Sequence, residues 1–209
     1  MKRPPPTKAD ILQTPRDFLR FAVSRFRQAG LVHGHGTTSV IDEAAYLILE
    51  TLSLPLDDIN PWLDARLLPA ERAALAAIIE KRVRTRKPAA YLTNKAYLQG
   101  LQFFVDERVI VPRSYIAELM AGELLHGQEH ALIPDPSRVG SVLDLCTGSG
   151  CLAIMAARHF PAAHVTATDI SRDALAVAQI NVRDHEVTDR VELIRSDLFD
   201  KLGSRRFDL

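Results

Sequence analysis

Residues 141–154 constrain the fold of this chain more than any other stretch. They read Ser-Val-Leu-Asp-Leu-Cys-Thr-Gly-Ser-Gly-Cys-Leu-Ala-Ile, an apolar run that breaks at a Gly-x-Gly turn and continues into helical sequence. A buried strand that leads through a glycine turn into a helix builds the nucleotide pocket of doubly wound α/β sheets. The glycines allow a ligand to approach the backbone, and the helix N-terminus presents unpaired N–H groups. The stretch therefore predicts a nucleotide-binding, Rossmann-like domain.

The pattern around this turn alternates regularly. We expect strands at 141–146, 164–169 and 191–195, a helix at 150–159, and a second helix that begins at Ser171. Strands that alternate with helices predict a parallel sheet with right-handed crossovers. The fold class is therefore α/β in this half of the chain.

The first half of the chain has a helical pattern. A Pro-rich loose tail (1–13) precedes a predicted helical domain (14–88). Signals for helix starts stand at Thr14-Pro15, at Ser39 with Asp42, and at Pro69. The basic run 81–87 reads as a solvated helix end, favoured by the helix dipole, in preference to an RNA contact. His33-Gly34-His35-Gly36 reads as a Gly-rich loop in preference to a metal pair.

Short β-prone runs follow and predict a hairpin linker over 89–113. The runs are 91–92, 96–98, 101–105 and 109–111, with turns at 99–100 and 106–107. A helix that carries Ile116, Leu119, Met120 and Leu124 and a polar loop (127–140) lead into the nucleotide-binding domain, which we assign to 114–209.

Charge and cysteine content exclude several function classes. Lys+Arg and Asp+Glu both number 26, so net charge does not drive binding to nucleic acid or membrane. No apolar run is long enough to span a bilayer, and no apolar segment follows the basic N-terminus as in a signal peptide. Cys146 and Cys151 lack metal-ligand spacing. We expect a reduced cytoplasmic protein without a metal site.

Three aspartates near strand ends discriminate between two nucleotide cofactors. Gly148-x-Gly150 with Asp169 nineteen residues later satisfies the loose dinucleotide pattern. Asp144, however, would face the anionic pyrophosphate of NAD, which is unfavourable in a partly buried site. S-adenosylmethionine carries a sulfonium and an ammonium, which an acid attracts directly or through water. Asp197 could accept from an adenine amine. Each Asp alone could cap a helix, but the three together favour S-adenosylmethionine.

These motifs resemble the class I methyltransferases, and more narrowly the protein-glutamine N5-methyltransferases. That family has a helical domain, a hairpin linker and a Rossmann-like catalytic domain. The matching segments are 88–93, 109–114, 144–150, Asp169 and 196–199. Two branches differ in substrate: the glutamine of the Gly-Gly-Gln motif in release factors, or a glutamine of large ribosomal subunit protein three. Segments 36–49 and 111–114, together with Cys146 where the first branch has glycine, favour the ribosomal-protein branch.

The resemblance implies a cofactor site and a role for the helical domain. The methionine portion would be cradled by Cys146, Thr147, Gly148, Ser149 and Gly150. The ribose hydroxyls would bind Asp169, the adenine would lie at Asp197 and Leu198, and Pro112 and Arg113 would lie near the cofactor's edge. The helical domain would recognise the ribosomal-protein substrate, with no need for direct nucleic-acid or membrane binding, and the enzyme would be a monomer.

The family's catalytic Asn-Pro-Pro-Tyr motif is absent from these 209 residues. In the family its Asn and following Pro carbonyl accept from the glutamine amide and orient it for attack on the methyl. Residues 206–209 read as the opening of a fourth strand, which belongs beside the first. We therefore expect the natural chain to continue by roughly 100 residues, the strand bearing Asp144 to be an unpaired edge in this chain, and this chain alone to be inactive.

Three alternatives remain open. The first is the release-factor branch, and the second is a nucleic-acid adenine N6-methyltransferase, which the neutral charge disfavours. The third is a cofactor-binding fragment without turnover.

Overall fold

The computed structural model describes residues 11–34, 37, 39–122, 133 and 135–209. The chain divides into two compact units, Met1–Thr93 and Asn94–Leu209, so the boundary lies inside the expected linker 89–113. Within the described ranges, no helix is both long and apolar enough to cross a membrane.

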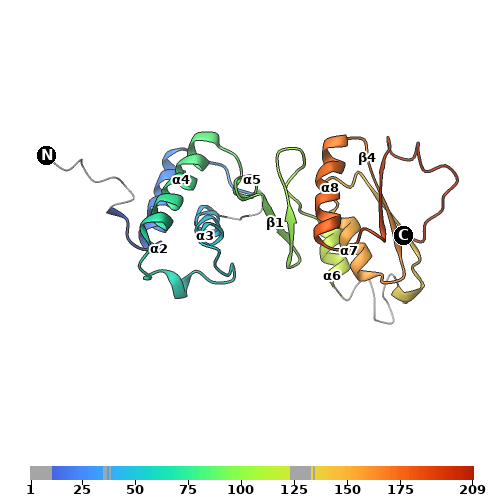
Figure 1. Cartoon of the computed structure of the whole chain (residues 1–209), viewed down its shortest axis with the longest axis horizontal. Helices are drawn as coiled ribbons and strands as arrows, with labels where there is room; N and C mark the ends of the chain where they lie inside the picture. Colours follow the sequence, from blue (N-terminus) through green and yellow to red (C-terminus); the bar gives the residue numbers. More distant parts are fainter. Residues whose placement is uncertain (1–10, 35–36, 38, 123–132, 134) are drawn as a thin grey trace. The chain divides into compact units, whose positions relative to one another are not determined.

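The first unit is helical in the described residues (Figure 1). Its elements are α2 (Pro15–Gln28), α3 (Val40–Thr51), the 3-10 helix η1 (Asn60–Trp62), α4 (Pro69–Thr85) and α5 (Ala89–Thr93). The predicted start signals are confirmed: Thr14 and Ser39 cap α2 and α3 through their side chains, and Pro69 is the first residue of α4. The hydroxyls of Thr14 and Ser39 accept hydrogen bonds from backbone N–H groups that have no partner within the helix.

An apolar core holds these helices together. Phe18 and Phe26 from α2, Leu47 from α3, and Leu75 and Ile79 from α4 are fully buried in one cluster. Each occurs at helical spacing, so one face of each helix points inward. Leu12 also belongs to this cluster, so the packed unit begins before residue 14; residues 1–10 of the expected tail lie outside the described residues.

A buried ionic cluster corrects one prediction. Arg82 of the basic run is 2% exposed, and its guanidinium donates to the Glu43 carboxylate at 2.7 Å. The Glu43 carboxylate also contacts His33 Nδ1 and accepts from the Ala89 N–H. The prediction of a solvated helix end is thus wrong for Arg82, although Lys81 and Arg84 are exposed. A carboxylate inside the helical unit explains the difference, because a buried acid requires a charged partner. His35 lies outside the described residues.

The second unit begins with a two-stranded hairpin. β1 (Lys95–Leu98) pairs antiparallel with β2 (Leu101–Phe104) around the predicted turn at residues 99–100. Two predicted strand segments are wrong. Tyr91 and Leu92 lie in α5, and residues 109–111 form no strand because the Val109 N–H closes a turn on the Asp106 carbonyl. The short helix α6 (Tyr115–Ala121) follows. Leu124 and half of the predicted loop 127–140 lie outside the described residues, and η2 (Pro136–Arg138) lies in the half that is described.

A three-stranded parallel sheet forms the centre of this unit. Its strands are β3 (Ser141–Leu145), β4 (His164–Asp169) and β5 (Val191–Arg195), in the order β3-β4-β5. The crossover helices α7 (Cys151–His159) and α8 (Arg172–Asp184) follow β3 and β4. This arrangement confirms the predicted α/β sheet and the helix expected from Ser171, which is the N-cap of α8. For β3, α7, β4 and β5, the observed bounds agree with the expected ones to within one residue.

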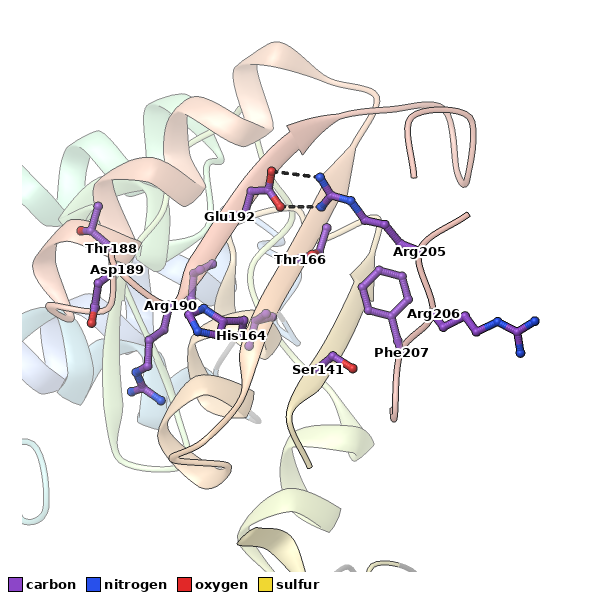
Figure 2. Close-up of a pocket in the computed structure, with 12 residues that line it drawn as sticks. Ser141, His164, Thr166, Thr188, Asp189, Arg190, Glu192, Arg205, Arg206 and Phe207 are labelled. Atoms are coloured by element: carbon purple, nitrogen blue, oxygen red, sulfur yellow. Dashed lines mark hydrogen bonds and ion pairs between the residues drawn. The ribbon is translucent and has the colours of Figure 1, made fainter. Parts of the chain in front are cut away.

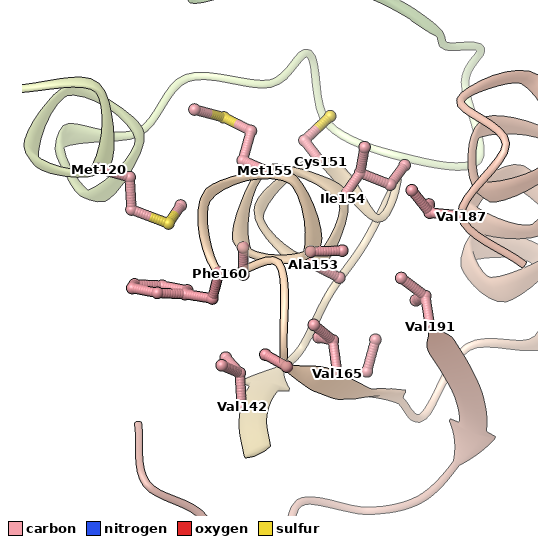
Figure 3. Close-up of a cluster of buried hydrophobic side chains, with 14 of the residues drawn as sticks. Met120, Val142, Cys151, Ala153, Ile154, Met155, Phe160, Val165, Val187 and Val191 are labelled. Atoms are coloured by element: carbon pink, nitrogen blue, oxygen red, sulfur yellow. The ribbon is translucent and has the colours of Figure 1, made fainter. Parts of the chain in front are cut away.

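The apolar face of the sheet packs on α7. The register aligns Val142 with Val165, and Val165 with Val191, so the three valines form a row. Figure 3 shows these valines across from Ala153 and Ile154 of α7, and all five belong to one buried cluster. Burial of apolar side chains on one face of each strand holds the strand ends in a common plane.

The residues after β5 return to the open side of β3. The Leu143 N–H donates to the Leu209 carbonyl at 2.9 Å, and the Asp208 N–H donates to the Ser141 carbonyl at 3.0 Å. The Asp208 carboxylate also accepts from the N–H groups of Gly140 and Ser141. Asp208 and Leu209 therefore lie beside the first strand as expected, although residues 206–209 form no assigned strand. The expectation of an unpaired edge is wrong at Ser141 and Leu143.

Candidate functional site

The carboxyl ends of the three parallel strands meet at one edge of the sheet. Cys146 follows β3 directly, Asp169 is the last residue of β4, and Asp197 stands two residues after β5. The Thr147 N–H donates to the Thr168 carbonyl at 2.8 Å, which draws the glycine turn over the end of β4. Ligands of open α/β sheets bind outside this end of the strands. The sequence motifs and the topology thus point to the same edge.

The glycine turn adopts a conformation that few residue types tolerate. Cys146, Gly148 and Gly150 have φ values of 58°, 57° and 80°. At Gly150 an added Cβ would lie 3.1 Å from the Ala178 Cβ of α8, whereas at Gly148 it would meet nothing within 4 Å. Gly150 is thus required for close packing of the two helices, and Gly148 leaves open space beside the backbone.

Asp169 is held by the turn that it faces. One carboxylate oxygen accepts from the Gly148 N–H at 2.9 Å, and the other accepts from the Ser171 N–H at 2.9 Å. These bonds fix the carboxylate between the glycine turn and the start of α8. Each oxygen retains a lone pair, so the group can accept a further bond from a ligand hydroxyl.

Asp144 lies behind the turn and is tied to it. Its carboxylate accepts from the Thr147 hydroxyl at 2.5 Å. Burial raises the pKa of the Asp144 carboxyl above its ordinary value; the Thr147 hydroxyl lowers this pKa, and the negative charge of Asp169 adds to the increase. Asp144 and Asp169 therefore both lie close to the turn, and in the described part of the chain neither forms an ion pair, whereas Arg108 of the cavity lining is paired with Asp106. The electrostatics of this edge favour a positively charged ligand.

A cavity of about 400 Å³ opens beside the turn, within the second unit. Seven of the predicted site residues line it: Cys146, Thr147, Gly148, Ser149, Asp169, Pro112 and Arg113. Four predicted site residues do not line it. Asp144 lies in β3 and Gly150 caps α7, and Asp197 and Leu198 are exposed after the end of β5. The volume is in the range of pockets that hold small molecules.

Other lining residues escaped the sequence reading. They are Leu98, Arg108, Val109, Ile110, Ser114, Cys151, Leu152, Ser171 and Ala174. Most of them come from the hairpin and the segment after it, which the sequence indicated only as a linker. Cys151 is buried, and burial raises the pKa of its thiol to about 12, so it lines the cavity as an uncharged thiol. Cys146 is exposed.

A larger cavity of about 620 Å³ lies elsewhere in the unit and contains none of the predicted site residues. Figure 2 shows Ser141 and His164, the first residues of β3 and β4, together with Glu192, Arg205 and Phe207 around it. This is the amino end of the strands, opposite to the edge where ligands of such sheets bind. The smaller cavity at the glycine turn is therefore the candidate site.

Comparison with known proteins identifies the class of this site. Residues 130–209 match the family described as Methyltransferase small domain. Together with the parallel sheet and the glycine turn at the carboxyl end of β3, this match defines a Rossmann-like class I methyltransferase fold. The class predicted from the sequence is confirmed, and the match supports S-adenosylmethionine over NAD as its cofactor.

The particular relatives are ribosomal protein uL3 glutamine methyltransferases. The chain is 55% identical to the one from Burkholderia pseudomallei over 193 residues, which cover 92% of this chain and 61% of the relative. It is 53% identical to the one from Bradyrhizobium diazoefficiens over 199 residues, which cover 95% of this chain and 62% of the relative. The resemblance inferred from the motifs is confirmed. The chain spans a little over three fifths of the length of these relatives.

Among solved structures, the N-terminal domain of human METTL16 in complex with SAH matches with a TM-score of 0.41 at 16% identity. That match covers 78% of this chain and 59% of the other.

Proposed function

We propose that the cavity beside the glycine turn binds S-adenosylmethionine and that the protein methylates a glutamine side-chain amide of ribosomal protein uL3. The observation that carries the cofactor assignment is the pair of acids, Asp144 and Asp169, joined through the glycine turn to a cavity at the carboxyl end of β3. Such a site suits a ligand with positive charge and ribose hydroxyls. The anionic pyrophosphate of NAD would be repelled there.

Each part of the cofactor has a complementary group among the chain's own residues. Asp169 accepts from the ribose hydroxyls through its remaining lone pairs, because the bonds to the Gly148 and Ser171 N–H groups already fix its orientation. The backbone from Cys146 to Gly150 cradles the methionine portion, since the absence of a Cβ at Gly148 allows close approach. The negative charge of Asp144 stabilises the sulfonium from behind the turn. Asp197 and Leu198 border the adenine, and Pro112 and Arg113 lie near the cofactor's edge.

The cofactor supplies an electrophilic methyl group on a positively charged sulfur. The residues of this chain that line the cavity hold the donor and orient that methyl. We therefore assign the donor half of the reaction to these residues.

The names of the relatives support uL3 as the substrate, with its glutamine amide as the methyl acceptor. Residues 14–88 would recognise the ribosomal protein, and the hairpin linker would join that domain to the methyltransferase domain at 114–209. Because the substrate is a component of the ribosome, we place the protein in the cytoplasm, as a monomer that needs no nucleic-acid or membrane contact.

Two measurements test the cofactor site without requiring turnover. Calorimetric titration should show binding of S-adenosylmethionine and no binding of NAD at the same concentrations. Saturating S-adenosylmethionine should also protect the exposed Cys146 from alkylation, whereas the buried Cys151 should stay unlabelled with or without ligand because its thiol remains protonated. Binding of NAD, or alkylation of Cys146 at the same rate with and without ligand, would contradict the assignment.

Transfer of a labelled methyl group tests the substrate. Purified uL3 and a peptide-chain release factor would be offered separately, and label should enter uL3 alone. Label in the release factor would assign the protein to the other branch of the family. Cofactor binding with no transfer to either protein would indicate a binding module without turnover.

A further inference from the structure

Asn181 of α8 connects two parts of the second unit that the sequence reading treated separately. It is 1% exposed, and its side-chain amide makes three hydrogen bonds. Nδ2 donates to the Ser149 carbonyl at 2.8 Å and to the Phe104 carbonyl at 3.0 Å. Oδ1 accepts from the Phe104 N–H at 2.7 Å. Both N–H groups of the amide are therefore used, and so is one acceptor site.

The two partners of Asn181 belong to the two segments that supply most of the cavity lining, the glycine turn and the hairpin with the chain that follows it. Ser149 is part of the glycine turn and lines the cavity itself. Phe104 is the last residue of β2, and the chain that continues from it contributes lining residues from Arg108 to Ser114. Asn181 lines no part of the cavity. Its side chain bonds directly to Ser149 of the glycine-turn wall and to Phe104, which precedes the lining residues of the other wall, and it satisfies the N–H and carbonyl of Phe104 as a neighbouring strand would.

We propose that Asn181 is a positioning residue that sets the spacing between the hairpin wall and the glycine-turn wall, and thereby the affinity for the cofactor. This inference rests on the proposed function, because it assumes that S-adenosylmethionine binds between these walls. Asn181 acts through Ser149 and Phe104 and touches no part of the ligand.

The chemistry of the position admits few substitutes. Leucine has a similar shape but can form none of the three bonds, and it would leave the Phe104 N–H and two carbonyls without partners. Ionised aspartate keeps the bond from the Phe104 N–H, but it places a negative charge beside the Ser149 and Phe104 carbonyls. Protonated aspartate regains one donor. The variants Asn181→Leu and Asn181→Asp therefore separate shape from hydrogen bonding.

His185 provides a matched control on the same helix face. Its Nε2 contacts the Gln102 carbonyl at 2.8 Å, and its ring lies 4.8 Å from the Phe103 ring. Like Asn181 it ties the end of α8 to β2, but its contacts with Gln102 and Phe103 do not involve the glycine turn. Val187→Ala, in the buried core of the same unit, controls for a general loss of stability.

The experiment measures the Kd for S-adenosylmethionine by calorimetry, well below the unfolding temperature of each variant. Asn181→Leu should bind at least about 10-fold more weakly than the parent chain. His185→Ala and Val187→Ala should stay within about 2-fold, whatever their unfolding temperatures. The ratio of the Asn181→Asp Kd to the parent Kd should fall as the pH is lowered, because protonation restores a donor. Because protonation also relieves the cost of a buried carboxylate to stability, the unfolding temperature of Asn181→Asp is measured at each pH, and only pH values at which the variant is fully folded are compared.

Three results would overturn the inference. The first is an unchanged affinity for S-adenosylmethionine in a folded Asn181→Leu variant, and the second is a loss of affinity in Val187→Ala as large as that in Asn181→Leu. The third, which decides the case if Asn181→Leu does not fold, is a Kd ratio for Asn181→Asp that does not change with pH. Failure of the parent chain to bind S-adenosylmethionine is a separate outcome: it would overturn the proposed function, and this inference with it.

Discussion

Replacement of Gly150 by alanine tests how the glycine turn is built. Two costs act at this position. The φ of 80° lies in the left-handed region, and an added Cβ would lie 3.1 Å from the Ala178 Cβ and 3.3 Å from its Cα. Gly148 offers a matched comparison, because its φ of 57° is also left-handed but its added Cβ would meet no atom within 4 Å. Gly148→Ala therefore carries the backbone cost alone.

The two costs have different sizes. Holding an alanine in the left-handed region costs about 1–2 kcal/mol, and forcing a methyl into a packed contact costs typically about 1–3 kcal/mol. We expect Gly148→Ala to lower the free energy of unfolding by about 1–2 kcal/mol and Gly150→Ala to lower it by about 2–5 kcal/mol. At roughly 4 °C per kcal/mol for a unit of this size, the second change is readily resolved by calorimetry of the transition that the second unit contributes.

A double variant separates the two costs. In Gly150→Ala with Ala178→Gly, the crowding atom is gone and the backbone cost remains, so the double variant should recover stability relative to Gly150→Ala, after correction for Ala178→Gly alone. If Gly148→Ala and Gly150→Ala are equally destabilising, or if the double variant recovers nothing, the contact between the turn and α8 does not have the role that we assign to it.

Three further predictions concern the acids. Glu43→Gln should destabilise the helical unit by about 3–5 kcal/mol in denaturant unfolding, because Arg82 would be a buried charge without its partner. The control Glu80→Gln, at the partly exposed ion pair with Arg25, should cost under about 1 kcal/mol. Equal losses of stability in the two variants would contradict the burial argument. Because burial raises the pKa of Asp144, the folded chain retains a proton that the unfolded chain has lost, so stability should fall as pH rises from the ordinary value of this carboxyl through the raised one. Asp144→Asn should abolish this pH-dependent fall in stability. It should also weaken binding of S-adenosylmethionine more than binding of the demethylated product, whose thioether sulfur is uncharged; equal weakening of binding for both ligands would exclude a charge effect. Asp169→Asn should reduce cofactor affinity by at least about 10-fold in calorimetry, because one of its two backbone bonds and its charge are lost together, and unchanged affinity would remove Asp169 from the site.

The second unit follows its sequence closely because its signals are local. The strand His164–Asp169, the turn at Gly148 and the cap at Ser171 each depend on residues within a few positions of one another. The same holds for the capped helices of the first unit. Hydrophobic periodicity and capping chemistry act over short distances, so they can be read from one sequence.

The errors involve partners that are distant in the chain. Arg82 was read as part of a solvated basic run because Glu43, thirty-nine residues earlier, is its partner only in the folded unit. Residues 109–111 have strand composition but no strand to pair with. Asn181 gave no signal, because an asparagine within an amphipathic helix is unremarkable until its contacts with Ser149 and Phe104 are known. Tertiary contacts decide such cases, and local propensity does not contain them.

The same division holds for the candidate site. The glycine turn and the strand-end acid Asp169 were predicted from their spacing, and both line the cavity. In the wall formed by Arg108 to Ser114, only Pro112 and Arg113 were predicted, from the family resemblance; Arg108, Val109, Ile110 and Ser114 were not, because their position depends on how the hairpin packs on α8. The spacing of residues in a sequence identifies site residues within one strand-turn-helix unit. It says little about a separate element, such as the segment after the hairpin, that forms the other wall of the cavity.

Asp169 has a consequence for how variant libraries of this protein would be interpreted. Its carboxylate holds the glycine turn and the start of α8 in place through two backbone bonds, independently of any ligand. A library selected only for soluble, folded chains should therefore retain aspartate at this position, although no selection for methyl transfer was applied. Retention of Asp169 would then be no measure of activity, and only a comparison of folded variants with and without cofactor can separate the two demands on this one residue.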